Sequence, residues 1–128
     1  MAVSGIVRRV SRDLRICFLG DSFVAGVGDP EHSGWVGRVA ARTHRGGHAF
    51  TGYNVGVRGQ TSVEVLARAR DECAQRLPHG CDGRVVISFG TDDTAWEGSA
   101  LRVAADASAA ALVWPAWSAW LAEDAPDA

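Results

Sequence analysis

The first ninety residues contain three mainly apolar segments separated by two stretches with helical periodicity. The segments Arg15–Leu19 and Arg84–Phe89 each carry a largely continuous apolar run that stops at a glycine. Such runs are typical of strands that are buried on both faces. Phe50–Val57 has a weaker version of the same pattern and is predicted to form a further strand between the other two in sequence.

The two intervening stretches are predicted to be helices. One runs from about Gly34 to His44, with Ser33 as its N-cap and a pair of glycines as its stop signal. The other begins at Thr61, which has capping-box spacing to Glu64. The side chains expected to face inward are Trp35, Val36, Val39 and Ala40 in the first helix, and Val63, Leu66, Cys73 and Leu77 in the second.

Strands and helices therefore alternate, and the strand starts are about 30–35 residues apart, which is the length of a βαβ unit. Right-handed crossovers give a parallel sheet with helices on both faces, so the expected fold class is α/β. Ligands bind such sheets beyond the carboxyl ends of the strands. The segments with the least ordinary residues lie there: Gly20–Ser22, Gly56–Gly59 and Gly90–Asp93.

Length and charge exclude several classes of protein. A chain of 128 residues with 47% hydrophobic and 22% charged residues has the size and composition of one globular domain. The net charge of −2 leaves no positive surplus for nucleic acid or an anionic membrane, so neither is expected as a partner. No apolar run reaches the ~18–20 residues of a membrane span. Met1–Asp13 lacks the apolar stretch of a signal peptide, and a cytoplasmic location is expected.

The character of the chain changes near residue 97. Residues 1–90 carry 12 Arg and 8 acidic residues, whereas residues 91–128 carry one Arg and 7 acidic residues. We expect an N-terminal extension over residues 1–13 and an α/β domain over 14–97. An acidic tail rich in alanine and tryptophan is expected over 98–128, helical at Asp106–Val113 and then frayed.

No metal ion and no cofactor are expected. Cys17, Cys73 and Cys81 lack the paired spacing of a zinc site. His44 and His48 are separated by two glycines, which break the helix that would place both on one face. The first two cysteines fall in apolar surroundings, where cysteine serves as a small buried hydrophobic residue.

Gly20-Asp21-Ser22 places a serine directly after the first predicted strand, among small neighbours that leave its hydroxyl accessible. Backbone N–H groups at the start of the following turn suit either a phosphate or an oxyanion. The segment is not a P-loop, because no Gly-Lys-Ser/Thr follows, and its glycines do not have dinucleotide-binding spacing.

Three segments together resemble the GDSL/SGNH hydrolase family of serine esterases and lipases. Gly20–Ser22 is similar to the family's first block, Asn54–Ser62 to its second, and Phe89–Thr94 to its third, which usually reads Gly-x-Asn-Asp. The resemblance covers roughly residues 14–97. It implies a flavodoxin-like three-layer α/β/α fold with a parallel sheet, incomplete here because only three strands are evident.

The resemblance also implies roles for particular residues. Ser22 falls on the position of the nucleophile, and its backbone N–H also serves the oxyanion hole. Gly59 is the best match to the glycine that supplies a second donor. Asp92 falls on the position of the asparagine whose side chain donates to the oxyanion.

Two departures from the family pattern affect the expected activity. A carboxyl at residue 92 replaces an amide that contributes ~2.7–4 kcal/mol in the transition state, and it imitates the amide only when protonated. The family's Asp-x-x-His block is not found in residues 98–128. Asp29–His32 has that spacing but directly follows the nucleophile, so we do not expect His32 to be the base for Ser22. We therefore expect a truncation or frameshift near residue 98, which leaves no working triad.

The expected function is hydrolysis of a small-molecule ester through a serine nucleophile, as the resemblance implies. An alternative is a catalytically silent flavodoxin-like module that binds a small anion, an acyl group or a partner chain. A third strand without a neighbour would offer an edge through which a homo-oligomer forms. A nucleotide-binding or receiver-type domain is a further alternative that the fold class alone admits.

Overall fold

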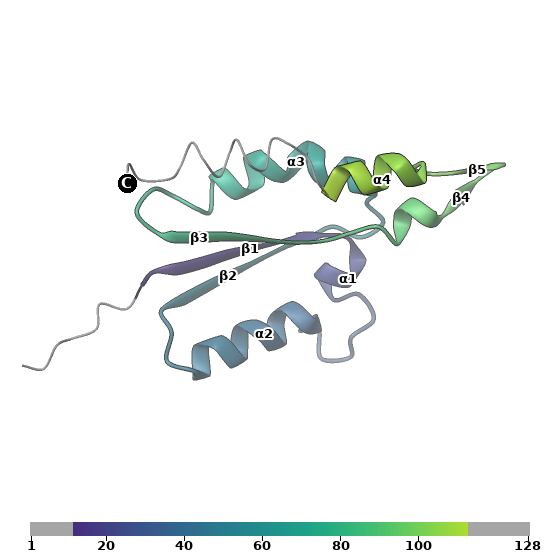
Figure 1. Ribbon diagram of the computed structural model, residues 1–128. Coiled ribbons are helices and arrows are strands. Elements are labelled where there is room, and N and C mark those ends of the chain that lie inside the picture. The colour runs from purple at the N-terminus through teal and green to yellow at the C-terminus, as the bar shows by residue number, and fades with distance from the viewer. Residues whose placement is uncertain (1–11, 113–128) are drawn as a thin grey trace, which may run out of the picture.

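The computed structural model describes residues 12–112 of the chain (Figure 1). Three parallel strands form the central sheet in the order β2-β1-β3. They are β1 (Leu14–Gly20), β2 (Phe50–Gly56) and β3 (Asp82–Ser88). Each strand coincides with one of the three apolar segments, so the predicted parallel α/β sheet is confirmed.

Helices lie on both faces of this sheet (Figure 1). α1 (Ser22–Ala25) and α2 (Gly34–Arg45) cover one face, and α3 (Ser62–Ala74) covers the other with α4 (Ala105–Leu112) against it. A 3-10 turn, η1 (Asp92–Thr94), follows β3 and leads into an antiparallel hairpin of β4 (Trp96–Glu97) and β5 (Ala100–Leu101).

The helix expected in the tail is confirmed by α4, which begins one residue earlier than expected. Its last expected residue, Val113, lies outside the described residues, as do most of the expected N-terminal extension and the rest of the tail.

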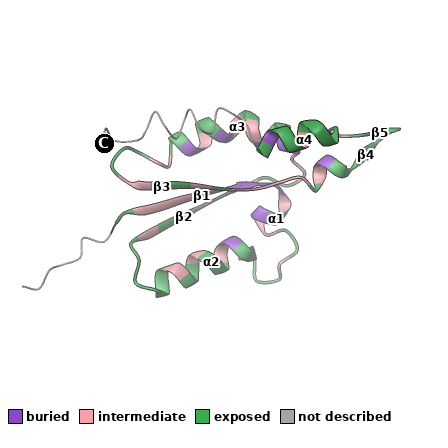
Figure 2. Ribbon diagram, viewed as in Figure 1, coloured by how far each residue is buried: buried purple, intermediate pink, exposed green. Residues whose placement is uncertain are grey.

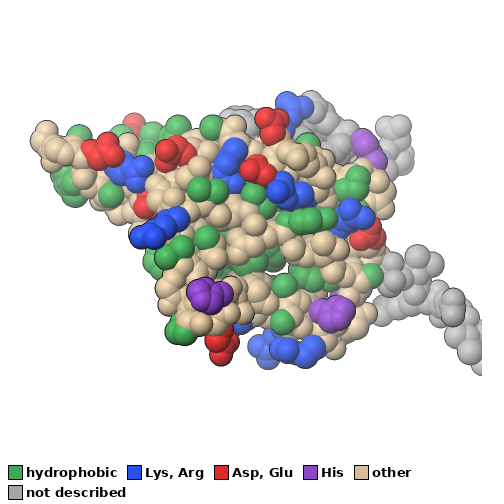
Figure 3. Space-filling model, turned by 180° about the vertical axis from the view of Figure 1, so that it is seen from behind, with side chains coloured by type: hydrophobic (Ala, Val, Ile, Leu, Met, Phe, Trp, Pro, Cys, Tyr) green, Lys and Arg blue, Asp and Glu red, His purple; other side chains and the backbone are tan. Residues whose placement is uncertain are grey.

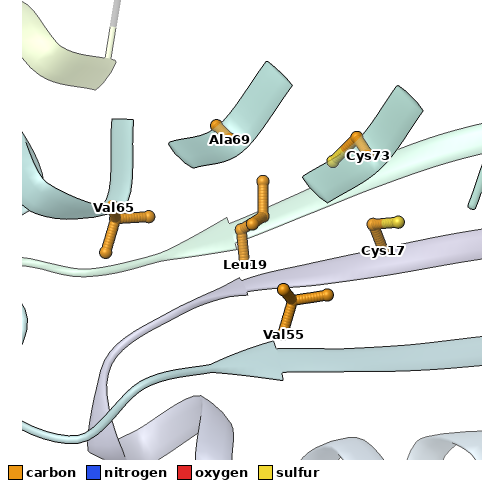
Figure 4. Close-up of a cluster of buried hydrophobic side chains, with 6 residues drawn as sticks. All are labelled: Cys17, Leu19, Val55, Val65, Ala69 and Cys73. Carbon is orange, nitrogen blue, oxygen red and sulfur yellow. The ribbon is translucent and has the colours of Figure 1, made fainter. Parts of the chain in front are cut away.

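The two faces of β1 supply two hydrophobic cores, because successive side chains of a strand alternate between faces. Figure 4 shows the core beneath α3, where cysteines from β1 and α3 lie close together. Its buried members are Cys17, Leu19, Val55, Val65, Ala69 and Cys73. The core beneath α2 contains Phe18, Val24 and Val36. The Trp35 ring packs edge-on against Phe18, with ring centroids 5.7 Å apart.

The inner faces of both long helices agree with the expected ones only in part. Val36, Cys73 and Leu77 lie in or against the cores, as expected. On α3, Val65 and Ala69 face the sheet with Cys73, whereas Val63 is 55% exposed. The helix begins at the buried Ser62, so residues three, seven and eleven positions later share its inner face. On α2, Val39 is 41% exposed, and Val36 is the buried valine.

Burial is concentrated where helices meet the sheet (Figure 2). Within residues 12–112, β3 is an edge strand whose only neighbour is β1, and its Val86 is 37% exposed. On the face seen in Figure 3, arginine and acidic side chains are interspersed rather than gathered by sign. None of the helices in the described part of the chain is both long enough and apolar enough to cross a membrane.

Candidate active site

The register of the sheet brings the three expected loops to one edge. Gly20 at the end of β1 pairs with Gly56 of β2 on one side and with Ser88 of β3 on the other. Two of these strand ends are also packed too closely for a side chain. A Cβ on Gly20 would lie 2.0 Å from the Ser88 carbonyl oxygen, and one on Gly56 would lie 2.3 Å from the Ala25 nitrogen. The loops therefore begin side by side.

The first loop holds Ser22 at the beginning of α1. The buried Asp21 is the N-cap of this helix, and its carboxylate accepts a hydrogen bond of 2.9 Å from the Phe23 N–H. At the other end Gly26, in the left-handed region, donates to the Ser22 carbonyl at 3.0 Å. These two bonds fix the loop around Ser22. Ser22 itself is half-buried.

The second loop is attached to the first by Asn54 and Val57. The Asn54 Nδ2 donates to the Val24 carbonyl in α1 at 2.8 Å, and its Oδ1 accepts from the Gly56 N–H. The Val57 N–H donates to the Gly20 carbonyl at 3.0 Å. These contacts fix the end of β2 against the segment that carries Ser22.

Gly59 occupies the third position of a turn in which Gln60 donates to the Val57 carbonyl. Its φ of +79° is the value that a type II turn requires at this position, and nothing lies near the place of a Cβ. Glycine is therefore needed for backbone conformation and not for space. The N–H at the third position of such a turn is not used by the turn's own hydrogen bond, so it is free to donate to a ligand.

Arg68 of α3 joins the strand ends beneath both loops, a role that the sequence analysis did not detect. Its guanidinium donates to the Gly20 carbonyl at 3.0 Å, to the Val55 carbonyl at 2.8 Å and to the Gln60 side chain at 2.6 Å. Burial lowers the pKa of this group, although an arginine remains charged at any ordinary pH.

The third loop is tied down by Asp93. Its buried carboxylate accepts from the Ser62 N–H at 2.7 Å and from the Ser108 hydroxyl at 2.5 Å. Burial raises the pKa of Asp93, but hydrogen bonds from Ser108 and Ser62 outweigh it, and the pKa lies below the usual carboxyl range. These bonds anchor the third loop to α3 and α4.

Asp92, the neighbouring residue, has a different environment. Its Oδ2 is buried and has no hydrogen-bond partner among residues 12–112. Its Oδ1 lies 3.9 Å from Nη1 of Arg102, a second arginine that the sequence analysis did not single out. Its signal was present in the composition, because Arg102 is the one basic residue among residues 91–128.

Asp29 and His32 do not form an acid–base pair through the Asp29 carboxylate. That carboxylate accepts from the N–H groups of Ser33 and Gly34 and forms an ion pair of 2.7 Å with Arg38. The Arg38 guanidinium, together with the Gly34 N–H, holds the pKa of Asp29 far below its usual range. Asp29 thus fixes the start of α2, whose N-cap residue is Ser33, as expected. Ser33 makes no side-chain capping bond.

The chain has four histidines, and their positions differ with respect to the edge that carries Ser22. His44 lies at the end of α2 and His48 just before β2, so both are at the amino edge of the sheet. His79 precedes β3 and lies at the same amino edge. His32, which is exposed and has a φ of +54°, is the one histidine in a loop at the carboxyl edge.

A cavity of about 290 Å³ lies beside η1, between the hairpin and α4, and its walls are mainly apolar. Its lining residues are Asp93, Thr94, Leu101, Val103, Ala105, Ser108, Ala109 and Leu112. Residues 12–112 contain no group of three His, Cys, Asp or Glu side chains placed to hold a metal ion.

A doubly covered parallel sheet with a Gly-Asp-Ser turn and two further loops at one edge is the arrangement of the SGNH hydrolase fold. The chain matches the model of the GDSL-like Lipase/Acylhydrolase family over residues 18–123 and belongs to this family. The match continues past residue 97, where the resemblance recognised in the sequence ends.

Solved structures with the same fold include an SGNH-hydrolase family esterase, AlinE4. The likeness has a TM-score of 0.53 and 22% sequence identity, and it covers 66% of this chain and 42% of that one. A serine variant of the same esterase matches with a TM-score of 0.65 and 20% identity, over 89% of this chain and 56% of that one. The chain thus spans about half the length of these esterases. No curated protein matches it.

Proposed function

We propose that this protein hydrolyses small esters with Ser22 as the nucleophile. The observation that carries the proposal is the register of Gly20 with Gly56 and Ser88, because it starts the three family loops side by side. Membership of an acylhydrolase family supports the same reaction. A catalytically silent module is not favoured by either observation.

In the proposed reaction, the Ser22 oxygen forms a bond to the acyl carbon while its proton passes to a base. The resulting oxyanion accepts hydrogen bonds from the N–H groups of Ser22 and Gly59. Collapse of this intermediate expels the alcohol, and water then cleaves the acyl-enzyme and regenerates Ser22. The cavity beside η1 offers apolar space next to the third loop for part of the substrate.

The group that accepts the Ser22 proton determines which esters the protein can use as substrates. No histidine within residues 12–112 is oriented by Asp29, whose carboxylate is occupied by α2 and Arg38. We therefore propose esters of acidic alcohols as substrates, since their leaving groups depart without receiving a proton from a general acid.

We also propose that the protein is located in the cytoplasm and that it forms a homodimer. Cys17 and Cys73 lie together in the core as free thiols, which suits the reducing cytoplasm. The outer edge of β3 is unpaired within the described residues, and strand pairing across it would form a homodimer.

The test is hydrolysis of p-nitrophenyl acetate by the wild type and by Ser22→Ala. Ser99→Ala, at an exposed position of the hairpin, is the matched control. We expect Ser22→Ala to lower kcat/KM by about 100-fold or more and the control to leave it unchanged. Equal rates for the wild type and Ser22→Ala would exclude the proposal.

A further inference from the structure

Arg102 contacts four parts of the candidate site with one guanidinium group. Its Nη1 donates to the Gly59 carbonyl at 3.0 Å and lies 3.9 Å from Oδ1 of Asp92. Its Nη2 is 3.6 Å from the Glu64 carboxylate, and its Nε is 3.3 Å from the Glu97 carboxylate. A single nitrogen therefore lies between the second and the third loop.

The hairpin after η1 places this arginine. The Arg102 N–H donates to the Ala95 carbonyl at 2.8 Å, and the Val103 N–H donates to the Asp93 carbonyl. The hairpin extends away from the sheet, with Trp96 68% exposed at β4, and then returns the chain to η1 (Figure 1). Arg102 follows β5, where the chain returns from the hairpin, and its side chain is only 25% exposed.

The positive charge of Arg102 lies beside Asp92, a carboxylate that would repel the oxyanion of the proposed reaction. The family resemblance assigns Asp92 to the position next to the oxyanion, where its carboxylate would face the negative charge of the proposed intermediate. One of its oxygens is buried without a partner among residues 12–112. Two like charges in a partly buried site raise each other's free energy. A guanidinium within 4 Å of Asp92 offsets that repulsion, although Glu64, Glu97 and the nearby Asp93 share the same positive charge.

The contact with Gly59 has a separate effect. Glycine has more accessible backbone conformations than other residues, so a glycine at a donor position loses more entropy when it is ordered. Fixing the Gly59 carbonyl restricts rotation of this residue and therefore the direction of its N–H. A donor that is already oriented requires no reorganisation during the reaction.

From this geometry we propose that Arg102 is a positioning residue for the oxyanion site: it orders Gly59 and balances the charge of Asp92. The proposal rests on the proposed ester hydrolysis. It explains how the site tolerates aspartate where the family's third block usually has asparagine, and it assigns a purpose to the hairpin.

The test compares four proteins: wild type, Arg102→Met, Asp92→Asn and the double variant. Arg84→Met, at an exposed ion pair with Asp82 at the start of β3, is the control. We expect Arg102→Met to lower kcat for p-nitrophenyl acetate by roughly tenfold, with a smaller change in KM. Asp92→Asn should restore much of that loss in the double variant, because the carboxylate that Arg102 balances is then absent. A purely structural role for Arg102 gives no such restoration.

A second measurement does not depend on turnover. The ¹⁵N order parameter of the Gly59 amide should fall in Arg102→Met and stay unchanged in Arg84→Met. If the wild type shows no Ser22-dependent hydrolysis, the proposed function fails, and this order parameter still decides the positioning role. If Arg102→Met does not fold by circular dichroism, Arg102→Lys replaces it, since lysine keeps the charge but loses the planar fork. Unchanged kcat together with an unchanged order parameter would overturn the inference.

Discussion

Arg68 Nη2 lies 3.0 Å from the carbonyl oxygen of Gly20, two residues before Ser22. The same guanidinium also holds the Val55 carbonyl and the Gln60 side chain. One side chain of α3 therefore fixes the ends of β1 and β2 together with the loop that contains Gly59. The positions of the two proposed oxyanion donors, Ser22 and Gly59, depend on a residue that belongs to none of the three family blocks.

Arg68→Met should destabilise the fold and lower the reactivity of Ser22. The substitution leaves two buried carbonyls without their charged donor, a change that costs about 2–3 kcal/mol. Chemical denaturation measures the loss, and Arg42→Met, at an exposed position of α2, is the control. Equal stability of the two variants would show that the Arg68 contacts do not hold the strand ends together.

Gly56→Ala should be more harmful than Gly83→Ala. A Cβ at residue 56 would lie 2.3 Å from the Ala25 nitrogen, so either α1 or the end of β2 must shift. A Cβ at residue 83 would lie 3.4 Å from its nearest neighbour, the Leu77 Cβ, which is an ordinary contact. We expect a loss of about 1–3 kcal/mol for the first variant and no loss for the second. Similar melting temperatures for both would contradict the close approach of α1 to β2.

Asp93→Asn should reduce the stability of the fold at neutral pH and remove part of the pH dependence of that stability. The asparagine Oδ1 still accepts from the Ser62 N–H, but its amide nitrogen cannot accept from the Ser108 hydroxyl. We expect this to cost about 1–2 kcal/mol of stability. The pKa of Asp93 in the folded protein lies below its unfolded value. Its contribution is therefore complete above a pH of about 4 and is lost as the pH falls through the folded pKa.

Thermal melts of the wild type and Asp93→Asn between neutral and acidic pH measure this difference. The melting temperatures of the two proteins should converge below a pH of about 4. A gap that stays constant over the whole range would mean that Asp93 is not ionised in the folded protein.

His32→Gln should leave the Ser22-dependent rate nearly unchanged. Asp29 is bound to α2 and to Arg38, so it does not orient the His32 ring as the acid of a triad does. A general base contributes about 10²–10⁴-fold, so hydrolysis of p-nitrophenyl acetate distinguishes the two cases. A loss of about 100-fold on His32→Gln would identify His32 as the base after all.

Local signals accounted for what the sequence predicted well. The three apolar runs became the three strands, and Thr61 and Glu64 form the capping box that their spacing indicated. All of these depend on short-range patterns or on a strand end, which an amino-acid sequence displays directly.

The errors and omissions arose from contacts distant in sequence. Arg68 is 48 residues from Gly20, and Arg102 is 43 residues from Gly59, so no spacing rule connects either pair. On α3, Val63 was assigned to the inner face, whereas the buried start of the helix places Val65 and Ala69 inward together with the expected Cys73. Ser33 is the N-cap residue of α2, as predicted, but its side chain makes no capping bond. Asp29 of the preceding loop instead accepts from the N–H groups of Ser33 and Gly34.

The most direct test of Ser22 as the nucleophile is covalent labelling with a fluorophosphonate, in which the serine oxygen displaces fluoride from phosphorus. The account predicts a single adduct by intact-mass spectrometry, located on Ser22 by peptide mapping and absent from Ser22→Ala. A wild-type protein that remains unlabelled, or an adduct found on another residue, would contradict it.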